Sequence, residues 1–399
     1  MKISNDTYAS LQFTINWKSK QAKHTEVYHG GKVNLWRDVL PQNVKEDLEG
    51  KEPGDVIHNH FTENIPYNPQ QVIEVERNQF NGKKLGMETL GPHAGRYYPM
   101  GILKLPGIFP DDLRPFRCVG TDSSNIKADF NHPFAGKDFE LKTEVLDVKQ
   151  KQREVGGSCN SWLDTITEGP GMQARWDGVA TDFFTKDAFT REDEQDDSQF
   201  YQKPRLTTHL DDKALENVRD LYGELLEPGM DILDLMSGWR SHIPDIELNS
   251  LTGLALNEEE MKNNPQLTDY VLHDVNRNPR LPFEDNSFDA IVCTSSVEYV
   301  TKPLELFKEC ARVLRTNGVF INVFSNRWFP PKVVKLWTEL QDFERMGLVL
   351  EYYLRTEEFD DLETYSVRGY PRPVEDSYFP QVTLSDPIYA VWGRVSISN

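Results

Sequence analysis

Short apolar runs alternate with amphipathic segments from about residue 205 onward, and this alternation restricts the possible folds more than any other feature of the chain. Apolar residues recur on one helical face in two segments, KALENVRDLYGELL and PLELFKECARVLRTNG. Asp211 or Asp212 is expected to cap the first helix, and Gly318 to end the second. The intervening runs are typical of buried parallel strands: DILDLM, SLTGLAL, YVLHDV, FDAIVCTSSV and GVFINVF. The pattern predicts a doubly wound, mostly parallel α/β sheet.

Polar and small residues follow several of these predicted strands. Ser237 and Gly238 come directly after the first strand, and Asp274 and Asn276 come after the third. In an open α/β sheet, ligands bind beyond the carboxyl ends of the strands. A small residue and a glycine at a strand end also allow the backbone to approach a ligand closely. The sequence therefore predicts a nucleotide-type ligand at this edge of the sheet.

The segment LPFEDNSFDAIVCTSSVEYVTKPLELFKECARVLRTNGVFINVFSN resembles the corresponding part of class I, type-11-like methyltransferases. The strings DLMSGWRSHIP, LNEEEM and FSNRWFPPKVVKLW resemble a subfamily of these enzymes whose substrate is unassigned. The resemblance covers about residues 200 to 395. It implies a Rossmann-like domain that uses S-adenosyl-L-methionine and releases S-adenosyl-L-homocysteine.

The same resemblance implies a set of cofactor-binding residues. Asp234 occupies the place of the acid that ends the first strand, while Met236 replaces the first glycine of the usual turn. Ala255 stands where a second acid is expected to hold the ribose, so Asn257 is predicted to take that role. Asp274 matches the acceptor of the adenine amine. The full predicted cofactor set is Arg205, Asp234, Ser237, Gly238, Trp239, Asn257, Asp274, Val275 and Ser295.

Arg205 lies in YQKPRLTTHLDD, which resembles a lid segment, and its guanidinium is predicted to pair with the methionine carboxylate. The acceptor is expected to be a small molecule with a thiol or another heteroatom nucleophile. A hydroxyl or carbon nucleophile would need a general base. The predicted catalytic residues are Glu298, Tyr299 and His242. Alternatively, Glu298 is a carboxylate at a helix start, and His242 is a capping or core histidine.

The N-terminal half has a different pattern, with alternating runs such as LQFTINW and FELKTEVLDV that predict strands, and one predicted helix at NVKEDLEG. ADFNHPFAGKDFELKTEVLDV and VLPQNVKEDLEGKEPGDVI resemble FKBP-type prolyl isomerases of the SlyD-like kind. The resemblance covers about residues 10 to 150 and implies an α+β domain with an enlarged flap at about 62 to 125. Leu141 replaces a pocket phenylalanine of the family, so the domain is predicted to be a degenerate accessory module.

The predicted flap contains YYPMGILKLPGIFP, whose apolar residues suggest either a surface or ordinary packing. As a surface it would bind a peptide or cover the methyltransferase cleft. We therefore divide the chain into an FKBP-like domain at 1–150, a linker or lid at 151–200, and a methyltransferase domain at 201–399. The acidic tract TREDEQDDSQ in the middle part is expected to be a solvated linker or surface loop.

A net charge of −20 disfavours nucleic acids and anionic membranes as partners. The chain carries no membrane-length apolar run, no signal pattern and no CxxC pair, so we expect a cytoplasmic protein without a metal site. Two other functions stay open at this stage. One is a prolyl isomerase or peptide-binding chaperone with a sensor-like methyltransferase domain, and the other is a protein methyltransferase.

Overall fold

The computed structural model describes residues 1–82, 91–152 and 157–397. Its contacts divide the chain into two compact units. The first unit comprises Met1–Lys186 together with Glu339–Leu348, and the second comprises Asp187–Thr338 and Val349–Asn399. The first unit is therefore not continuous in sequence. Whether residues 151–200 act as a separate linker or lid stays a prediction.

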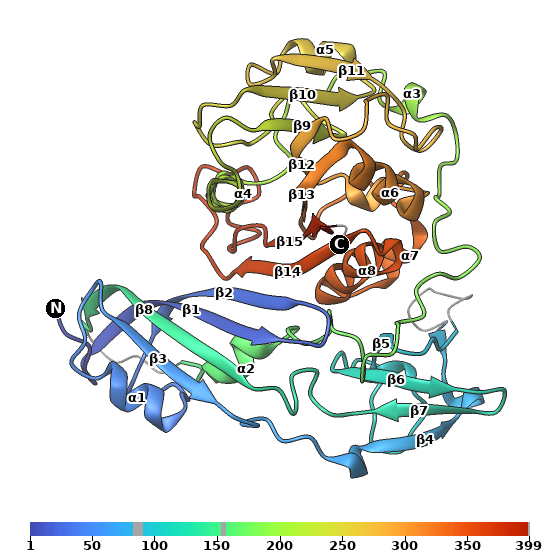
Figure 1. The fold of residues 1–399 in the computed structure, drawn as a ribbon. Coiled ribbons are helices and arrows are strands. Elements are labelled where there is room, and N and C mark those ends of the chain that lie inside the picture. Colours follow the sequence, from blue (N-terminus) through green and yellow to red (C-terminus); the bar gives the residue numbers. More distant parts are fainter. Residues whose placement is uncertain (83–90, 153–156, 398–399) are drawn as a thin grey trace. The chain divides into compact units, whose positions relative to one another are not determined.

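An antiparallel sheet with the order β2-β1-β8-β3 forms the centre of the first unit (Figure 1). Its strands are β1 (Thr7–Lys18), β2 (Lys23–Val33), β3 (Val56–Phe61) and β8 (Phe139–Gln150). Inward-facing residues alternate along β1, whose burial pattern has period two over almost its whole length. Two short helices, α1 (Gln42–Leu48) and α2 (Trp162–Thr167), contribute Val44, Leu48 and Trp162 to the same hydrophobic core.

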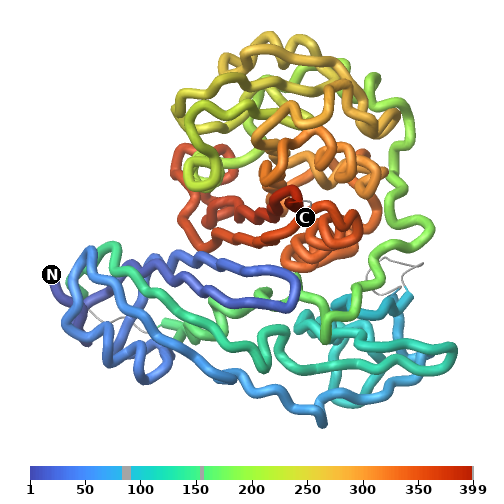
Figure 2. Tube along the Cα trace, viewed as in Figure 1, coloured from blue at the N-terminus to red at the C-terminus, as the bar shows by residue number. Residues whose placement is uncertain are grey.

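A second antiparallel sheet is inserted between β3 and β8, in the region predicted to be an enlarged flap (Figure 2). Its order is β4-β7-β6-β5, from β4 (Val72–Glu76), β5 (Tyr97–Pro99), β6 (Pro115–Thr121) and β7 (Asn125–Asp129). This sheet has a hydrophobic core of its own, which includes Tyr98 and Ile102. The apolar residues of YYPMGILKLPGIFP thus serve mainly as packing, and the idea that they form an exposed apolar flap surface is wrong for Tyr97, Tyr98 and Ile102.

The second unit contains the predicted α/β sheet, with the order β11-β10-β9-β12-β13-β15-β14. The strands from β11 to β13 are parallel, and β15 runs antiparallel to both of its neighbours. The bounds are β9 (Asp231–Leu235), β10 (Ser250–Ala255), β11 (Asp269–Leu272), β12 (Phe288–Thr294), β13 (Leu314–Phe324), β14 (Phe359–Arg368) and β15 (Ile388–Val395). The chain leaves β9 toward β10 on one side and reaches β12 on the other, so the strand order reverses between β9 and β12. This reversal is where an open α/β sheet has its ligand crevice.

Helices flank this sheet, with α4 and α6 on opposite sides in Figure 1. The helices are α3 (Asp197–Phe200), α4 (Asp212–Leu225), α5 (Glu258–Lys262), α6 (Pro303–Val313), α7 (Lys335–Glu339) and α8 (Asp342–Thr356), of which Glu339 and residues 342–348 belong to the first unit. Asp211 caps α4 as predicted, accepting hydrogen bonds from the backbone of Lys213 and Ala214. Gly318 does not end α6. That helix stops at Val313, and Gly318 lies within β13, packed against Leu314 and the backbone of Asp289.

The acidic tract is also more ordered than a solvated linker. Asp197 is buried and pairs with Arg191 and with Lys332, whose side chain is fully buried. Arg191 Nη1 lies 2.8 Å from Asp197 Oδ2, and Lys332 Nζ lies 3.1 Å from Asp197 Oδ1. Arg191 belongs to the tract itself, whereas Lys332 comes from a distant part of the sequence, so the burial of Asp197 depends in part on a tertiary contact.

Candidate functional site

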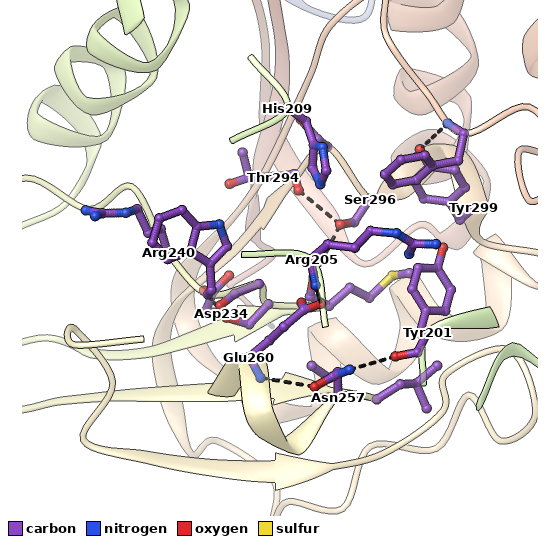
Figure 3. A pocket seen from close by; sticks show the side chains of 18 of the residues that line it. Tyr201, Arg205, His209, Asp234, Arg240, Asn257, Glu260, Thr294, Ser296 and Tyr299 are labelled. Carbon is purple, nitrogen blue, oxygen red and sulfur yellow. Dashed lines mark hydrogen bonds between the residues drawn. The ribbon is translucent and has the colours of Figure 1, made fainter. Parts of the chain in front are cut away.

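A cavity opens at the carboxyl ends of β9, β10, β11 and β12 (Figure 3). Among the residues predicted to form the site, all except Glu298 line it. The lining also includes aromatic and polar side chains, namely Tyr201, Thr207, Thr208, His209, Glu260, Thr294, Ser296 and Phe329. The cavity therefore lies at the reversal of strand order, where the sequence placed a ligand.

Three non-glycine residues of the lining have left-handed backbones: Met236 (φ 57°), His242 (φ 58°) and Ser295 (φ 48°). Such conformations cost free energy and cluster at functional sites. Met236 turns the chain sharply after β9, which brings Ser237 and Gly238 to the cavity. A Cβ placed on Gly238 would meet no atom within 4 Å, so open space lies in front of this residue.

Asp234 lies beneath this turn and is only 3% exposed, and this burial raises its pKa from 3.8 to about 7. Hydrogen bonds from Ser237 and Ser241 oppose that rise. The Ser237 hydroxyl donates to Asp234 Oδ2 over 2.5 Å. The carboxyl group is thus held by serines rather than by a cation, and it fixes the turn that carries Gly238.

This raised pKa predicts how Asp234→Asn changes stability with pH. The unfolded carboxyl ionises near pH 4 and the folded one near pH 7, so its contribution to stability is lost as the pH rises through this window. We expect the variant, measured against wild type by urea unfolding, to gain on the order of 3 kcal/mol between pH 4 and pH 8.

Asp231→Asn is the comparison, because hydrogen bonds from Ser250 and Asn249 lower the pKa of Asp231 on the same strand. That variant should be less stable than wild type at both pH values. If Asp234→Asn instead lost stability relative to wild type as the pH rose, Asp234 would be a stabilising carboxylate and this account of the turn would be wrong.

The end of β10 is apolar, since it consists of Ala255 and Leu256, and α5 begins two residues later. Asn257 caps α5 by accepting a hydrogen bond from Glu260 N over 3.0 Å. Its amide nitrogen donates to the carbonyls of Tyr201 (2.7 Å) and Gln202 (3.2 Å). Asn257 lines the cavity as predicted, but both amide donors are engaged with the chain around Tyr201.

The segment of residues 200–209 contributes its backbone and aromatic rings to the site. Arg205 N donates to Glu260 Oε1 over 2.7 Å, and the indole nitrogen of Trp239 donates to Thr207 O over 3.1 Å. The guanidinium of Arg205 lies 4.4 Å from the ring centroid of Phe200 and 4.8 Å from that of Phe329. No carboxylate among the described residues forms a salt bridge with Arg205, so its charge is available to an anionic ligand.

Asp274 and Val275 follow β11 at the edge of the cavity. Asp274 Oδ1 accepts hydrogen bonds from the backbones of Asn276 (2.9 Å) and Arg277 (3.1 Å), which orients the carboxylate. Asn276 in turn donates to Asp197 and to Tyr299 O. This edge is consequently held by a polar network that reaches the turn after β12.

The turn after β12 holds two of the three predicted catalytic residues. Tyr299 lines the cavity with its ring, which stacks on Phe329, and its hydroxyl accepts a hydrogen bond from Phe329 N over 2.8 Å. Burial raises the pKa of Tyr299 well above its usual value, so the phenol stays protonated at neutral pH. Glu298 is only 1% exposed and does not line the cavity, because its 3₁₀ turn directs the side chain into the protein.

His242, the third predicted catalytic residue, lines the cavity together with His209. Burial lowers the pKa of His242 to about 4, and the charges of Arg219 and Arg240 lower it further. Burial likewise lowers the pKa of His209, with contributions from Arg205 and Arg327. Both imidazoles are therefore neutral near pH 7, and their surroundings disfavour the protonated form.

Comparison with known proteins matches a part of the chain that lines this cavity to a known family. Residues 238–322 match the methyltransferase domain family. The matched residues include Gly238, Asn257, Asp274 and Ser295 of the cavity. The match covers β10, β11, β12 and most of β13, and it supports the predicted cofactor, S-adenosyl-L-methionine.

Two curated relatives share parts of this domain. A malonyl-[acyl-carrier protein] O-methyltransferase of Marinomonas sp. (strain MWYL1) is 30% identical over 79 residues, covering 20% of this chain and 28% of that protein. Cycloartenol-C-24-methyltransferase 1 of Oryza sativa subsp. japonica is 30% identical over 107 residues, covering 24% of this chain and 30% of that protein. The chain therefore spans less than a third of either relative.

Solved structures similar to this chain include two methyltransferases. One, from Haloferax volcanii, was solved in complex with the Trm112 methyltransferase activator; it is 16% identical, with 47% of this chain and 94% of that chain covered and a TM-score of 0.34. The other, from Bacillus halodurans, is 13% identical, with 46% and 100% covered and a TM-score of 0.33. Both similarities are restricted to about half of this chain.

Glu260, Thr294 and Ser296 also line the cavity, although the sequence did not mark them as site residues. A signal for Glu260 is present in LNEEEM. Its three-residue spacing from Asn257 at a helix start is typical of a glutamate that turns back toward the cap. Within the described ranges, no helix is long and apolar enough to cross a bilayer, and no group of three or more His, Cys, Asp or Glu is placed to hold a metal ion.

Proposed function

We propose that the chain is an S-adenosyl-L-methionine-dependent methyltransferase that acts on a small-molecule acceptor. The observation that carries the proposal is the cavity at the reversal of strand order, which is lined in part by the matched methyltransferase domain and contains three left-handed non-glycine residues. The aromatic rings and the short polar side chains suit a ligand with a nucleoside and an amino-acid end.

The residues present fit this cofactor. Asp274 and Val275 are proposed to bind the adenine, because the carboxylate accepts from the exocyclic amine and the Val275 backbone lies beside it. The open space at Gly238 would receive the amino-acid end, and Arg205 would pair with its carboxylate. Ser237, Trp239 and Ser295 would complete the wall of this site. The bound cofactor supplies a methyl group that its sulfonium has already activated.

The chain itself would then orient the acceptor, exclude water and receive a proton. Tyr299 and Phe329 provide a stacked apolar wall for the acceptor. His242 is proposed as the proton acceptor, since it lines the cavity and is held there by a left-handed backbone. The acceptor would be a thiol or another heteroatom nucleophile, whose proton is lost on methylation. A cytoplasmic location fits such a role.

We expect calorimetric titration with S-adenosyl-L-homocysteine to show binding to the wild-type chain and at least tenfold weaker binding to Asp274→Ala. The reason is that a buried ligand amine would lose its charged acceptor, which costs about 1.5–3 kcal/mol. Asp269→Ala is the matched control, because Asp269 is an exposed residue at the other end of β11. Absence of binding to folded wild type would rule out the proposed function.

For the first unit, we propose an FKBP-like accessory domain without isomerase activity. Trp162 packs against the sheet, stacking on Phe13 with ring centroids 5.6 Å apart, and its indole nitrogen donates to Asp38 over 2.8 Å. The adjacent residue, Ser161, forms a parallel bridge with Val39. We propose that Val39 and Leu40 match the apolar pair that precedes the helix in prolyl isomerases. These enzymes need an open aromatic pocket for their substrate, whereas the chain's own Trp162 lies beside Val39 and donates its backbone N–H to the Val39 carbonyl.

A further inference from the structure

We propose that Glu260 holds the ribose hydroxyls of the cofactor and replaces the acid that β10 lacks. The inference deepens the proposed function and rests on it. It starts from three observations. The first is the order of the strands at the cavity, and the second is the set of salt bridges and hydrogen bonds that already engage the other carboxylates there. The third is the position of Glu260 beneath the segment that contains Arg205 (Figure 3).

The order of the strands places the ribose over β10. Neighbouring strands lie about 4.8 Å apart, so the ends of β9 and β11 are separated by about 10 Å, with the end of β10 between them. In the cofactor, the ribose lies between the adenine and the amino-acid end. A ligand that extends from Gly238 to Asp274 therefore places its ribose over β10, whichever of its ends lies at β9.

A vicinal diol binds best to a carboxylate, which accepts from both hydroxyl groups. Four carboxylates line the cavity within the described part of the chain: Asp197, Asp234, Glu260 and Asp274. Asp197 forms salt bridges with Arg191 and Lys332. Asp234 accepts from two serines, and Asp274 lies at the adenine end.

Over β10 itself, Ala255 and Leu256 offer no polar side chain. Asn257 has both amide donors on the carbonyls of residues 201 and 202, and its oxygen caps α5. Glu260 Oε1 accepts from Arg205 N, while no hydrogen bond from a described residue reaches its Oε2. Glu260 is thus the carboxylate at β10 with an oxygen left for a ligand.

The contact with Arg205 also gives Glu260 a fixed orientation. Its carboxylate is tied to the backbone of residue 205, and the neighbouring Asn257 is tied to residues 201 and 202. A hydroxyl pair bound to Glu260 would therefore sit directly under this segment. Recognition of the ribose and closure of the segment over the cofactor would use the same side chain.

The test compares ligands that differ in one hydroxyl group. Calorimetry would give the affinities of the full chain for S-adenosyl-L-homocysteine and for its 2′-deoxy and 3′-deoxy analogues. We expect wild type to prefer the ribose form at least tenfold, and Glu260→Gln to reduce this preference to threefold or less. The control is Glu259→Gln, which changes an exposed neighbour on the same helix and should keep the full preference.

Each result decides between distinct statements. If Glu260→Gln weakens all three ligands equally and keeps the preference for the ribose, Glu260 only holds the segment around Arg205 and the inference is overturned. If folded wild type does not bind S-adenosyl-L-homocysteine, both the proposed function and the assignment of Glu260 are wrong. If wild type binds the ligand without preferring the ribose form, the proposed function stands and the assignment of Glu260 fails.

Discussion

Replacing Arg96 by alanine should lower the free energy of unfolding of the first unit by about 3–5 kcal/mol, because it leaves a buried carboxylate without its cation. Arg96 is 1% exposed, and its Nε lies 3.6 Å from Glu344 Oε1. Burial raises the pKa of Glu344, and the charge of Arg96 opposes that rise. Removing Arg96 would therefore push Glu344 toward its neutral form, and the hydrogen bond from Tyr97 N would weaken.

Urea unfolding of the full chain, followed by hydrogen exchange at the amides of β5 and β6, would measure this loss in the unit concerned. The double variant Arg96→Met with Glu344→Gln should recover most of the stability, since both charges leave together. Arg114→Ala should cause no measurable change, because the pair of Arg114 with Asp112 is on the surface. Equal losses in the single and double variants would show that the side-chain volume of Arg96, and not its charge, stabilises the unit.

Replacing Trp162 by alanine should destabilise the first unit by about 3–5 kcal/mol, as expected for a large aromatic side chain removed from a core. Trp162 is 7% exposed and contacts Phe13 and Tyr28, and its Cζ3 lies 3.1 Å from the position that a Cβ on Gly30 would take. The variant also loses the hydrogen bond to Asp38, although that carboxylate keeps the one from Asn34 N.

Thermal unfolding of the full chain and the exchange rates of the β1 and β8 amides would report the effect. Trp36→Ala is the matched control, since Trp36 is 60% exposed and its removal should change stability by about 0.5 kcal/mol or less. A loss below about 1 kcal/mol for Trp162→Ala would mean that α2 contributes little to the core. The variant would then also be the form in which peptide binding beside Val39 is worth measuring.

The sequence predicted the parallel strands of the second unit because the apolar run of each strand indicates, without any distant partner, that the strand is buried. Runs such as DILDLM are apolar on both faces, and the cap at Asp211 is a local feature of three residues. The positions of Gly238 and Asp274 followed from the same rule, since carboxyl ends of parallel strands share one edge. These features needed only short-range patterns and the usual topology of α/β sheets.

Features that depend on distant partners could not be predicted in this way. Glu260 acquires its role from Arg205, which is 55 residues away, and Tyr97 is bound by Glu344 across 247 residues. Arg96 stands beside a glycine in AGRYYP, where a charged residue suggests an exposed loop, yet a carboxylate from α8 buries it. The prediction that Glu298 lies in the site was wrong for a local reason. The end of β12 was located correctly, but the turn that follows it directs the side chain inward.

The discontinuous first unit has a consequence for how the protein is made. During translation, residues 1–186 leave the ribosome long before Glu344 has been synthesised, so Arg96 waits as an unpaired cation for most of the time that the chain takes to grow. The nascent first unit lacks residues 339–348 until most of the chain has been made. A gene divided after residue 186 would encode the cation without its carboxylate. The first half of the reading frame thus depends on the second for Glu339 and Glu344, the two carboxylates that pair with Arg96.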